Sequence, residues 1–276
     1  MSHRPDWLSI DRGEAALLLS IPHSGTDLRG LEDRFVSPWL ARRDADWWIN
    51  ELYSFAKDLN ATIVRTAVSR SVIDVNRDPS GRSLYPGMAT TELCPTTTFD
   101  GEPLYRDAAA IAADEIDARR LAYFDPYHAA LRDETARLRD LHRRVVVYDC
   151  HSIRSHIPRL FDGALPQFNI GTNDGRSCDP ILTEAIAAAC ADPAFTHVVN
   201  GRFKGGYITR SLGQPDRGVH AVQMELACRG YLNEPHAPVT PDNWPTPLDP
   251  HYAMPLRTVL QNVLERCIAF TFQPAS

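Results

Sequence analysis

The sequence predicts a three-layer α/β/α fold built around a mixed, mostly parallel central sheet. Short apolar runs alternate along the chain with segments that carry an apolar stripe at helical spacing. Several runs are apolar throughout, as in strands that helices cover on both faces. The chain shows no internal repeat and no low-complexity linker. Its 276 residues are therefore expected to form a single domain, 1–276.

The expected strands are apolar runs bounded by polar or turn-forming residues. The clearest is the valine-rich run that leads into Asp149 and His151, and the first one ends at Pro22 and His23. In chain order, the expected strands cover residues 15–23, 61–68, 71–76, 145–151, 168–172, 196–202 and 219–227.

The expected helices alternate with these strands. In the first of them, Trp48, Leu52, Phe55 and Leu59 share one apolar face. The expected helices cover residues 45–59, two stretches within 108–144 that are interrupted at "YFDPYH" (123–128), 179–190 and 255–270. The proline-rich segment Pro235–Pro250 is expected to form a surface loop.

Composition and charge exclude several classes of protein. Hydrophobic residues make up 43% of the chain and charged residues 23%, which is typical of a globular protein. Acidic residues outnumber basic ones by 35 to 29, and no basic run carries interleaved aromatics, so nucleic acid is not an expected partner. No apolar stretch approaches the roughly 18 residues of a membrane helix, and the first residues lack a signal-peptide core. The six cysteines show no CxxC spacing, which favours reduced thiols. Together these features predict a soluble cytoplasmic protein.

Polar residues lie in or after several of the expected strands. His23 and His151 each end a strand, Asn76 and Arg77 belong to "DVNRD", and Glu225 lies within "VQMEL". In sheets of this kind, ligands collect in the crevice at the carboxyl ends of the strands. We therefore expect these side chains to meet in one site.

The two histidines suit a divalent metal, because neutral imidazole is a good zinc ligand. A catalytic zinc usually takes three protein ligands and keeps one position open. The third ligand would be an acid, and "RRDADWW" offers Asp44 and Asp46. Either histidine taken alone could instead be a structural residue.

Glu225 is the candidate acid–base residue, because an unpaired acid within an otherwise apolar strand is costly. A metal would lower the pKa of a bound water to about 7, and a nearby carboxylate would pass the proton to the leaving nitrogen. Arg77 offers a planar fork for a substrate carboxylate. The alternatives are an edge-strand position for Glu225 and a structural ion pair at Asn76 and Arg77.

Two further signals are weaker. Cys150 precedes His151, but adjacent strand residues point to opposite faces, so Cys150 is expected in the core rather than as a nucleophile. "GRFKGG" lacks the spacing of a nucleotide-binding loop. Its Lys204, with Arg202 and Arg210, could hold an anionic substrate or form a solvated basic loop.

Eight motifs extend this interpretation over most of the chain, from about residue 15 to about residue 235. In order, they are "IPHSG", "SVIDVNRDPSG", "LYPG", "DCHSI", "PRLFDG", "NIGTNDG", "NGRFKGGYITR" and "VHAVQMEL". Together they resemble the N-formylglutamate amidohydrolase (deformylase) family. That family is similar to zinc carboxypeptidases and aspartoacylase-like deacylases, which implies a zinc-carboxypeptidase-like (phosphorylase/hydrolase-like) fold.

The resemblance also implies roles for individual residues. His23 and His151 match the two imidazole ligands of a zinc ion. Asn76 and Arg77 match the pair that grips a substrate carboxylate. Glu225 matches the general base and acid.

The acidic metal ligand is where the sequence departs from the related carboxypeptidases. They use a His-x-x-Glu motif, but Thr26 stands three residues after the first histidine. The deformylase-like "DADW" offers Asp46, which is favoured over Asp44, with Asp27 as a third choice. On a helix, the side chains of Asp44 and Asp46 would point about 200° apart, so only one of them is expected to reach the metal.

The resemblance implies a metal-dependent amidohydrolase that converts the dianion N-formyl-L-glutamate to formate and L-glutamate, the last step of one histidine-degradation route. The second substrate carboxylate needs another cation, and Arg70 or Arg210 is expected to supply it. One alternative is a metal-dependent deacylase or carboxypeptidase that acts on another N-acyl amino acid. A more distant one is a non-catalytic protein that binds acidic amino acids.

Overall fold

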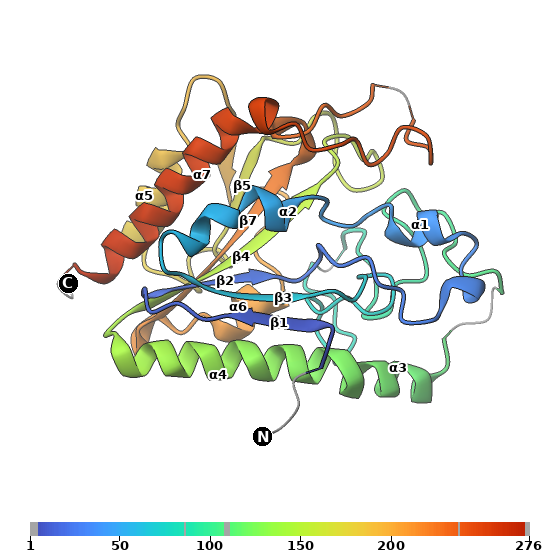
Figure 1. Ribbon diagram of the computed structural model, residues 1–276, viewed down its shortest axis with the longest axis horizontal. Coiled ribbons are helices and arrows are strands. Elements are labelled where there is room, and N and C mark those ends of the chain that lie inside the picture. The colour runs from blue at the N-terminus through green and yellow to red at the C-terminus, as the bar shows by residue number, and fades with distance from the viewer. Residues whose placement is uncertain (1–4, 86, 108–110, 237, 274–276) are drawn as a thin grey trace.

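A seven-stranded sheet runs through the part of the chain that the computed structural model describes, residues 5–85, 87–107, 111–236 and 238–273 (Figure 1). Its strand order is β1-β3-β2-β4-β7-β5-β6. The strands are β1 (Leu8–Asp11), β2 (Leu17–Ile21), β3 (Thr62–Thr66), β4 (Val145–Ile153), β5 (Phe168–Gly171), β6 (His197–Val199) and β7 (Val219–Ala227). The four strands β3, β2, β4 and β7 are parallel, whereas β1 and β5 run antiparallel to their neighbours β3 and β7. The sheet is therefore mixed and mostly parallel, as predicted.

Helices cover both faces of this sheet (Figure 1). One layer contains α3 (Ala113–Arg119), α4 (Asp125–Leu141) and α6 (Tyr207–Leu212), and the other contains α2 (Ile49–Leu52), α5 (Pro180–Ala189) and α7 (Pro250–Thr271). Alternate residues of β2 pack against the two helical layers, because successive side chains of a strand point to opposite faces of the sheet. Leu17 and Leu19 pack in the core beneath α7, whereas Leu18 packs with the residues of α4. The predicted three-layer class is confirmed.

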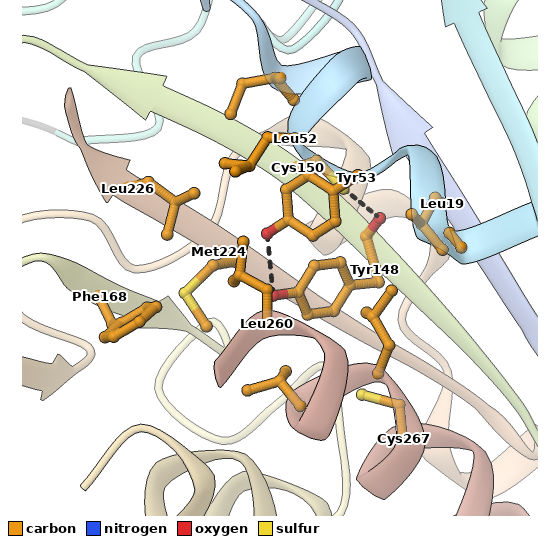
Figure 2. Close-up of a cluster of buried hydrophobic side chains, with 14 of the residues drawn as sticks. Leu19, Leu52, Tyr53, Tyr148, Cys150, Phe168, Met224, Leu226, Leu260 and Cys267 are labelled. Atoms are coloured by element: carbon orange, nitrogen blue, oxygen red, sulfur yellow. Dashed lines mark hydrogen bonds between the residues drawn. The ribbon is translucent and has the colours of Figure 1, made fainter. Parts of the chain in front are cut away.

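The core beneath α7 contains polar atoms that are paired within it. Figure 2 shows Tyr53 and Tyr148 pointing toward each other between β4 and α7, with their hydroxyl oxygens 3.2 Å apart. Cys150 lies in the same cluster, as predicted, and is fully buried. Every residue of β4 is buried, and each large apolar side chain removed from water contributes about 1.5–3 kcal/mol. The central strands therefore form a rigid support for the residues at their ends.

The segment 45–59, predicted as one long helix, is broken in the structure. Only α2 and a 3₁₀ turn at Ser54–Lys57 are helical, and Trp48 has a left-handed backbone with φ of 63°. Ahead of α2, the amide of Asp46 donates a hydrogen bond to the carbonyl of His23, at 2.9 Å. This contact bends the chain away from the helix that the apolar stripe predicted.

The segment 71–76, predicted as a strand, has no regular secondary structure. Val72, Ile73 and Val75 are buried as an apolar run requires. The backbone instead follows local turns, in which the amide of Asn76 donates to the carboxylate of Asp74 at 2.9 Å. The strand prediction was wrong here because polar side chains at the site determine the backbone.

The helical region before β4 continues where an interruption was predicted. A π-helical turn at Arg120–Phe124 joins α3 directly to α4, and Pro126, which has no amide to donate to the preceding turn, follows it at the start of α4. Residues 108–110, where the prediction began, lie outside the described residues. Helix α7 begins at Pro250, earlier than predicted, because Asp249 caps it by accepting from the amide of His251 at 2.8 Å.

Several short elements carry no sequence signal strong enough to predict them: β1, α6 and α1 (Pro38–Arg42). The proline-rich loop before α7 is fixed by Trp244, which is 2% exposed and donates a hydrogen bond to the carbonyl of Arg43. All six cysteines are buried and carry free thiols. Within the described ranges, no helix combines the length and apolar character that crossing a membrane requires.

Candidate active site

The carboxyl ends of β2, β4 and β7 bring the candidate site residues together. His23 follows β2, His151 lies near the end of β4, and Glu225 lies on β7. The register pairs His151 directly with Glu225 across two parallel strands. Neighbouring strands are about 4.8 Å apart, so these two side chains share one face at a distance that the sheet fixes.

Three buried side chains form a cluster that could hold one metal ion: His23, Asp46 and His151. The Nδ1 atoms of the two histidines are 3.1 Å apart. The Oδ2 atom of Asp46 lies 3.2 Å from Nδ1 of His151 and 3.7 Å from Nδ1 of His23. Tetrahedral zinc with bonds of about 2.0–2.1 Å separates its ligand atoms by roughly 3.3–3.4 Å. The spacing of the three atoms therefore fits a shared metal.

The other nitrogen of each histidine faces a second carboxylate. Nε2 of His23 is 2.8 Å from Asp74, and Nε2 of His151 is 2.8 Å from Asp149. A proton on Nε2 donated to these carboxylates leaves the Nδ1 lone pairs directed at the cluster, as in carboxylate–histidine–metal arrangements. The amide nitrogen of Asn76 also reaches this pair, at 3.2 Å from Asp149 and 2.9 Å from Nε2 of His151. The donor set thus fits a metal in its contacts as well as in its spacing.

Asp46 is the acid that the fold brings to the histidines. One of its oxygens accepts from the amide of Ser152 at 3.1 Å, and the other accepts from Arg70 at 3.3 Å. Asp44 points elsewhere, because it accepts from the amide of Phe99 at 2.7 Å.

Asp27, the third choice of acid, is paired with Arg29 at 2.8 Å. Only Asp46 among the three sequence candidates belongs to the cluster with the histidines.

The electrostatics of the cluster favour a bound cation. Burial and the charge of Arg70 lower the pKa of His23 and keep its imidazole neutral, which a metal ligand requires. Burial opposes ionisation of Asp46, but a hydrogen bond from His151 and the neighbouring positive charges hold its pKa below the usual value. Burial also opposes a charge on His151, yet Asp149 outweighs it and raises the pKa of this imidazole well above its usual value. The same negative surroundings that attract a proton to His151 attract a metal cation.

Glu225 has the properties of a proton-transfer residue. Burial raises its pKa to about 7; the charge of His151 opposes this shift and that of Asp46 reinforces it. One carboxylate oxygen accepts a hydrogen bond from Gln223 at 3.1 Å. A group with a pKa near the operating pH can both accept and return a proton.

A cavity of about 550 Å³ opens onto these residues, a size typical of small-molecule sites. Its polar lining includes His23, Arg70, Asn76, Arg77, His151, Arg202, Gln223 and Glu225. Its apolar lining includes Leu84, Leu93, Phe99, Ile153, Leu160 and Phe203. The cavity therefore joins the cluster of His23, Asp46 and His151 to a chamber with several cations and an apolar wall.

The predicted substrate-binding residues are placed differently from one another. Arg77 lines the cavity and is held by the carbonyl and hydroxyl of Thr91, at 3.1 and 3.0 Å. Arg70 also lines the cavity, but both of its terminal nitrogens face carboxylates of the site. Arg210 is not among the lining residues; it donates to the carbonyl of Gly205 and lies over the ring of Tyr85.

Sequence reasoning gave no role to Asp74 or Asp149, although both stand in quoted motifs. Their carboxylates could be assigned only once the histidine side chains were placed beside them. Gln223 was also missed, although it lies two residues before Glu225 and therefore on the same face of β7. The spacing of two residues between Gln223 and Glu225 was the sequence signal that could have identified Gln223.

The fold and the site together define an α/β protein that can hold a divalent metal beside an acid–base residue and a small-molecule cavity. The chain belongs to the N-formylglutamate amidohydrolase family, whose model matches residues 15–232. It is 43% identical over 265 residues to an N-formylglutamate deformylase of Pseudomonas putida, covering 95% of this chain and 96% of that protein. An N-formylglutamate deformylase of Pseudomonas aeruginosa is 48% identical over 229 residues, covering 82% of this chain and 86% of that protein.

Solved structures share the fold. The crystal structure of an N-formylglutamate amidohydrolase from Ralstonia eutropha aligns with a TM-score of 0.78 at 21% identity, covering 96% of this chain and 98% of that one. A gene product of Agrobacterium tumefaciens aligns with a TM-score of 0.71 at 17% identity, covering 98% of this chain and 97% of that one. The α/β architecture therefore extends to proteins of low sequence identity.

Proposed function

We propose that this protein hydrolyses N-formyl-L-glutamate to formate and L-glutamate with one zinc ion held by His23, Asp46 and His151. The observation that carries the proposal is the buried convergence of these three side chains beside Glu225, next to a cavity lined by arginines. Family membership and the names of the relatives at 43% and 48% identity support the same reaction.

Zinc is the proposed metal because two imidazole nitrogens and one carboxylate oxygen form a known catalytic zinc donor set. Bound there, the metal would polarise the formyl carbonyl and lower the pKa of a water in the site. Asp74 and Asp149 orient the two imidazoles from behind, at 2.8 Å each.

Glu225 is the proposed general base and then the general acid. Its carboxylate takes the proton from the attacking water and returns it to the amine nitrogen as the C–N bond breaks. Its pKa of about 7 suits both transfers. Gln223 donates a hydrogen bond to one carboxylate oxygen and so orients the other oxygen for the proton transfer.

Arg77 is the proposed grip on one substrate carboxylate. Asn76 lines the cavity beside it, but its side-chain oxygen accepts from the amide of Ile208 and its amide nitrogen lies near Asp149, so we assign Asn76 mainly to positioning. Thr91 fixes the guanidinium of Arg77 at the cavity, where its planar fork can bind two oxygens at once. Arg70 lies 3.3 Å from Asp46 and 2.7 Å from Asp74. We therefore assign Arg70 mainly to balancing the charge of these two carboxylates.

Metal analysis combined with a formate assay tests the proposal. The purified protein is expected to contain about one zinc per chain and to release formate from N-formyl-L-glutamate. Removal of the metal with a chelator should abolish formate release, and added zinc should restore it; this recovery is the control for damage by the chelator. Full activity in protein shown to be free of metal would contradict the zinc assignment.

We further propose that the reaction ends a histidine-degradation route in the cytoplasm, as the family resemblance implies. Cells without this protein are then expected to accumulate N-formylglutamate when fed histidine, and fractionation should recover the protein with cytoplasmic markers. Normal N-formylglutamate levels in such cells would argue against the pathway.

The apolar wall of the cavity favours one second candidate, a deacylase of larger N-acyl amino acids. Leu93, Phe99 and Leu160 lie in the same cavity as the arginines and could accept an acyl chain longer than formyl. A panel of formyl, acetyl and longer acyl derivatives of glutamate, compared by kcat/KM, separates the two candidates. The deformylase proposal expects the formyl derivative to be preferred.

A further inference from the structure

Arg202 differs from the other arginines of the cavity in its partners. It lies in the loop between β6 and α6 and lines the cavity with Arg70 and Arg77. Its Nε donates to the carbonyl of Leu160 at 2.7 Å, and Nη2 donates to the carbonyl of Ala89 at 2.9 Å. Both partners are neutral, so the positive charge of Arg202 is held in position without being neutralised.

The two other cavity arginines that are not exposed, Arg70 and Arg77, are balanced by the protein itself, whereas Arg82 also lines the cavity but is exposed. Arg70 lies 2.7 Å from Asp74, and Arg77 lies 3.4 Å from the same carboxylate. Across the described parts of the chain, no carboxylate lies within 4.0 Å of the Arg202 guanidinium. Among the three cavity arginines that are not exposed, Arg202 is therefore the one best able to accept an external anion.

The surroundings of Arg202 increase its need for an anion. Its guanidinium lies over the rings of Tyr85 and Phe203, with its carbon 5.6 and 5.2 Å from their centroids. Burial lowers the pKa of Arg202; Tyr85 and Glu225 favour its charge, and the charge of Arg77 opposes it. Two guanidinium groups close enough to repel each other in a partly desolvated cavity favour a ligand that carries negative charge.

The geometry points to Arg202 as the residue that binds the second carboxylate of an acidic N-acyl amino acid whose first carboxylate is held by Arg77. This inference rests on the proposed function. It replaces the earlier expectation for that carboxylate, since Arg70 faces two carboxylates of the site and Arg210 is not among the lining residues. Arg202 would thereby determine the preference for acidic over neutral side chains.

The test compares N-formyl-L-glutamate with N-formyl-L-glutamine, which has nearly the same shape and lacks the second charge. Arg202→Gln is expected to lower kcat/KM for N-formylglutamate about 10²- to 10³-fold, mainly through KM, because it removes one partner of a partly buried charge pair. For N-formylglutamine, kcat/KM should change less than about threefold. Arg202→Lys should keep part of the preference, because it keeps the charge but not the fork.

The matched control is Arg176→Gln, the same change at an exposed arginine that does not line the cavity; it should leave both substrates unaffected. An equal loss on the two substrates, or no loss on either, would overturn the assignment of Arg202. If Arg202→Gln does not fold, the wild-type enzyme decides the matter: a ratio of kcat/KM near one for the two substrates would also overturn it. If the wild-type protein does not release formate from N-formylglutamate at all, the proposed function itself fails.

Discussion

Glu225 shows how far the position of one residue can change its chemistry. An ordinary glutamate is ionised well below neutral pH, but burial raises the pKa of this one to about 7. Gln223 makes a hydrogen bond to it from the same strand face, and His151 lies opposite it on the next strand. The residue thus combines a fixed position with a proton affinity suited to catalysis.

Replacement of Glu225 tests this role at the scale of one residue. Glu225→Gln keeps the size and the hydrogen-bonding capacity of the side chain but removes its basicity. We expect kcat to fall by about 10²- to 10⁴-fold, the usual value of positioned proton transfer. The zinc content and the KM should change little, because Glu225 is not one of the three clustered side chains that could hold a metal ion.

Steady-state kinetics with N-formylglutamate, together with metal analysis, provide the measurement. Glu265→Gln, on α7 and exposed, is the control. Loss of zinc in the Glu225 variant would instead indicate that the carboxylate is a metal ligand.

At the scale of elements, the start of α6 is pressed against the segment 71–76. The amide of Ile208 donates to the side-chain oxygen of Asn76 at 2.8 Å, and Asn76 in turn reaches Asp149. Gly206 permits this approach, because a Cβ atom there would lie 2.3 Å from the amide nitrogen of Asn76. An irregular segment is thus held in place by a helix more than a hundred residues later in the chain.

Gly206→Ala should therefore disturb the site from outside it. The added methyl group must displace Asn76, and forcing extra volume into a packed region typically costs about 1–3 kcal/mol. We expect lower thermal stability together with at least a tenfold loss of kcat/KM. Ser211→Ala, an exposed change on the same helix, should alter neither. Unchanged activity in the Gly206 variant would show that the position of Asn76 is not critical.

At the scale of the whole molecule, His128 on α4 is a buried histidine outside the cluster of His23, Asp46 and His151. Its Nε2 donates to the carbonyl of Val75 at 2.7 Å, and its ring contacts Phe124 and Tyr207. Burial lowers the pKa of His128 to about 4, whereas an unfolded histidine has a pKa of about 6.5. Between these values the unfolded chain binds more protons, so this stabilising contribution is complete above pH 6.5 and is lost as the pH falls toward 4.

His128→Gln should flatten that part of the stability curve. With about 1.4 kcal/mol for each pKa unit, the loss attributable to His128 in the wild type is at most about 3 kcal/mol. Denaturant unfolding of both proteins from pH 7 to pH 4 measures the difference, and His251→Gln, at an exposed position, is the control. Parallel curves for wild type and the His128 variant would contradict this account. The same experiment examines the prediction of a single domain, residues 1–276, which expects one cooperative transition.

The parts of the fold that the sequence predicted are those with local patterns. The run at 219–227 matches β7, and β4 continues only two residues beyond its predicted end. His23 and His151 could be found because strands of this kind place their carboxyl ends at one edge. Local periodicity and strand order were therefore enough to predict most of the architecture and the positions of the two histidines.

The parts that could not be predicted depend on contacts between distant segments. The bend before α2 follows from the hydrogen bond between the amide of Asp46 and the carbonyl of His23. The spacing of apolar residues in a sequence does not indicate such a bond. The carboxylates behind the histidines and the neutral anchors of Arg202 are also tertiary contacts. Treating Asp44 and Asp46 as helical predicted only that one of them would reach the metal, whereas the structure separates them through turns.

The pairing of β4 with β7 has a consequence for how this enzyme can change. His151 and Glu225 are paired in a continuous hydrogen-bond ladder in the middle of the sheet, so slipping either strand by one position would turn its own side chain to the wrong face. The relative position of these two side chains is therefore fixed by the pairing of the two strands. New substrate preferences must arise in the loops around it, where Arg77 and Arg202 lie, and directed evolution toward other N-acyl compounds should accumulate its useful changes there.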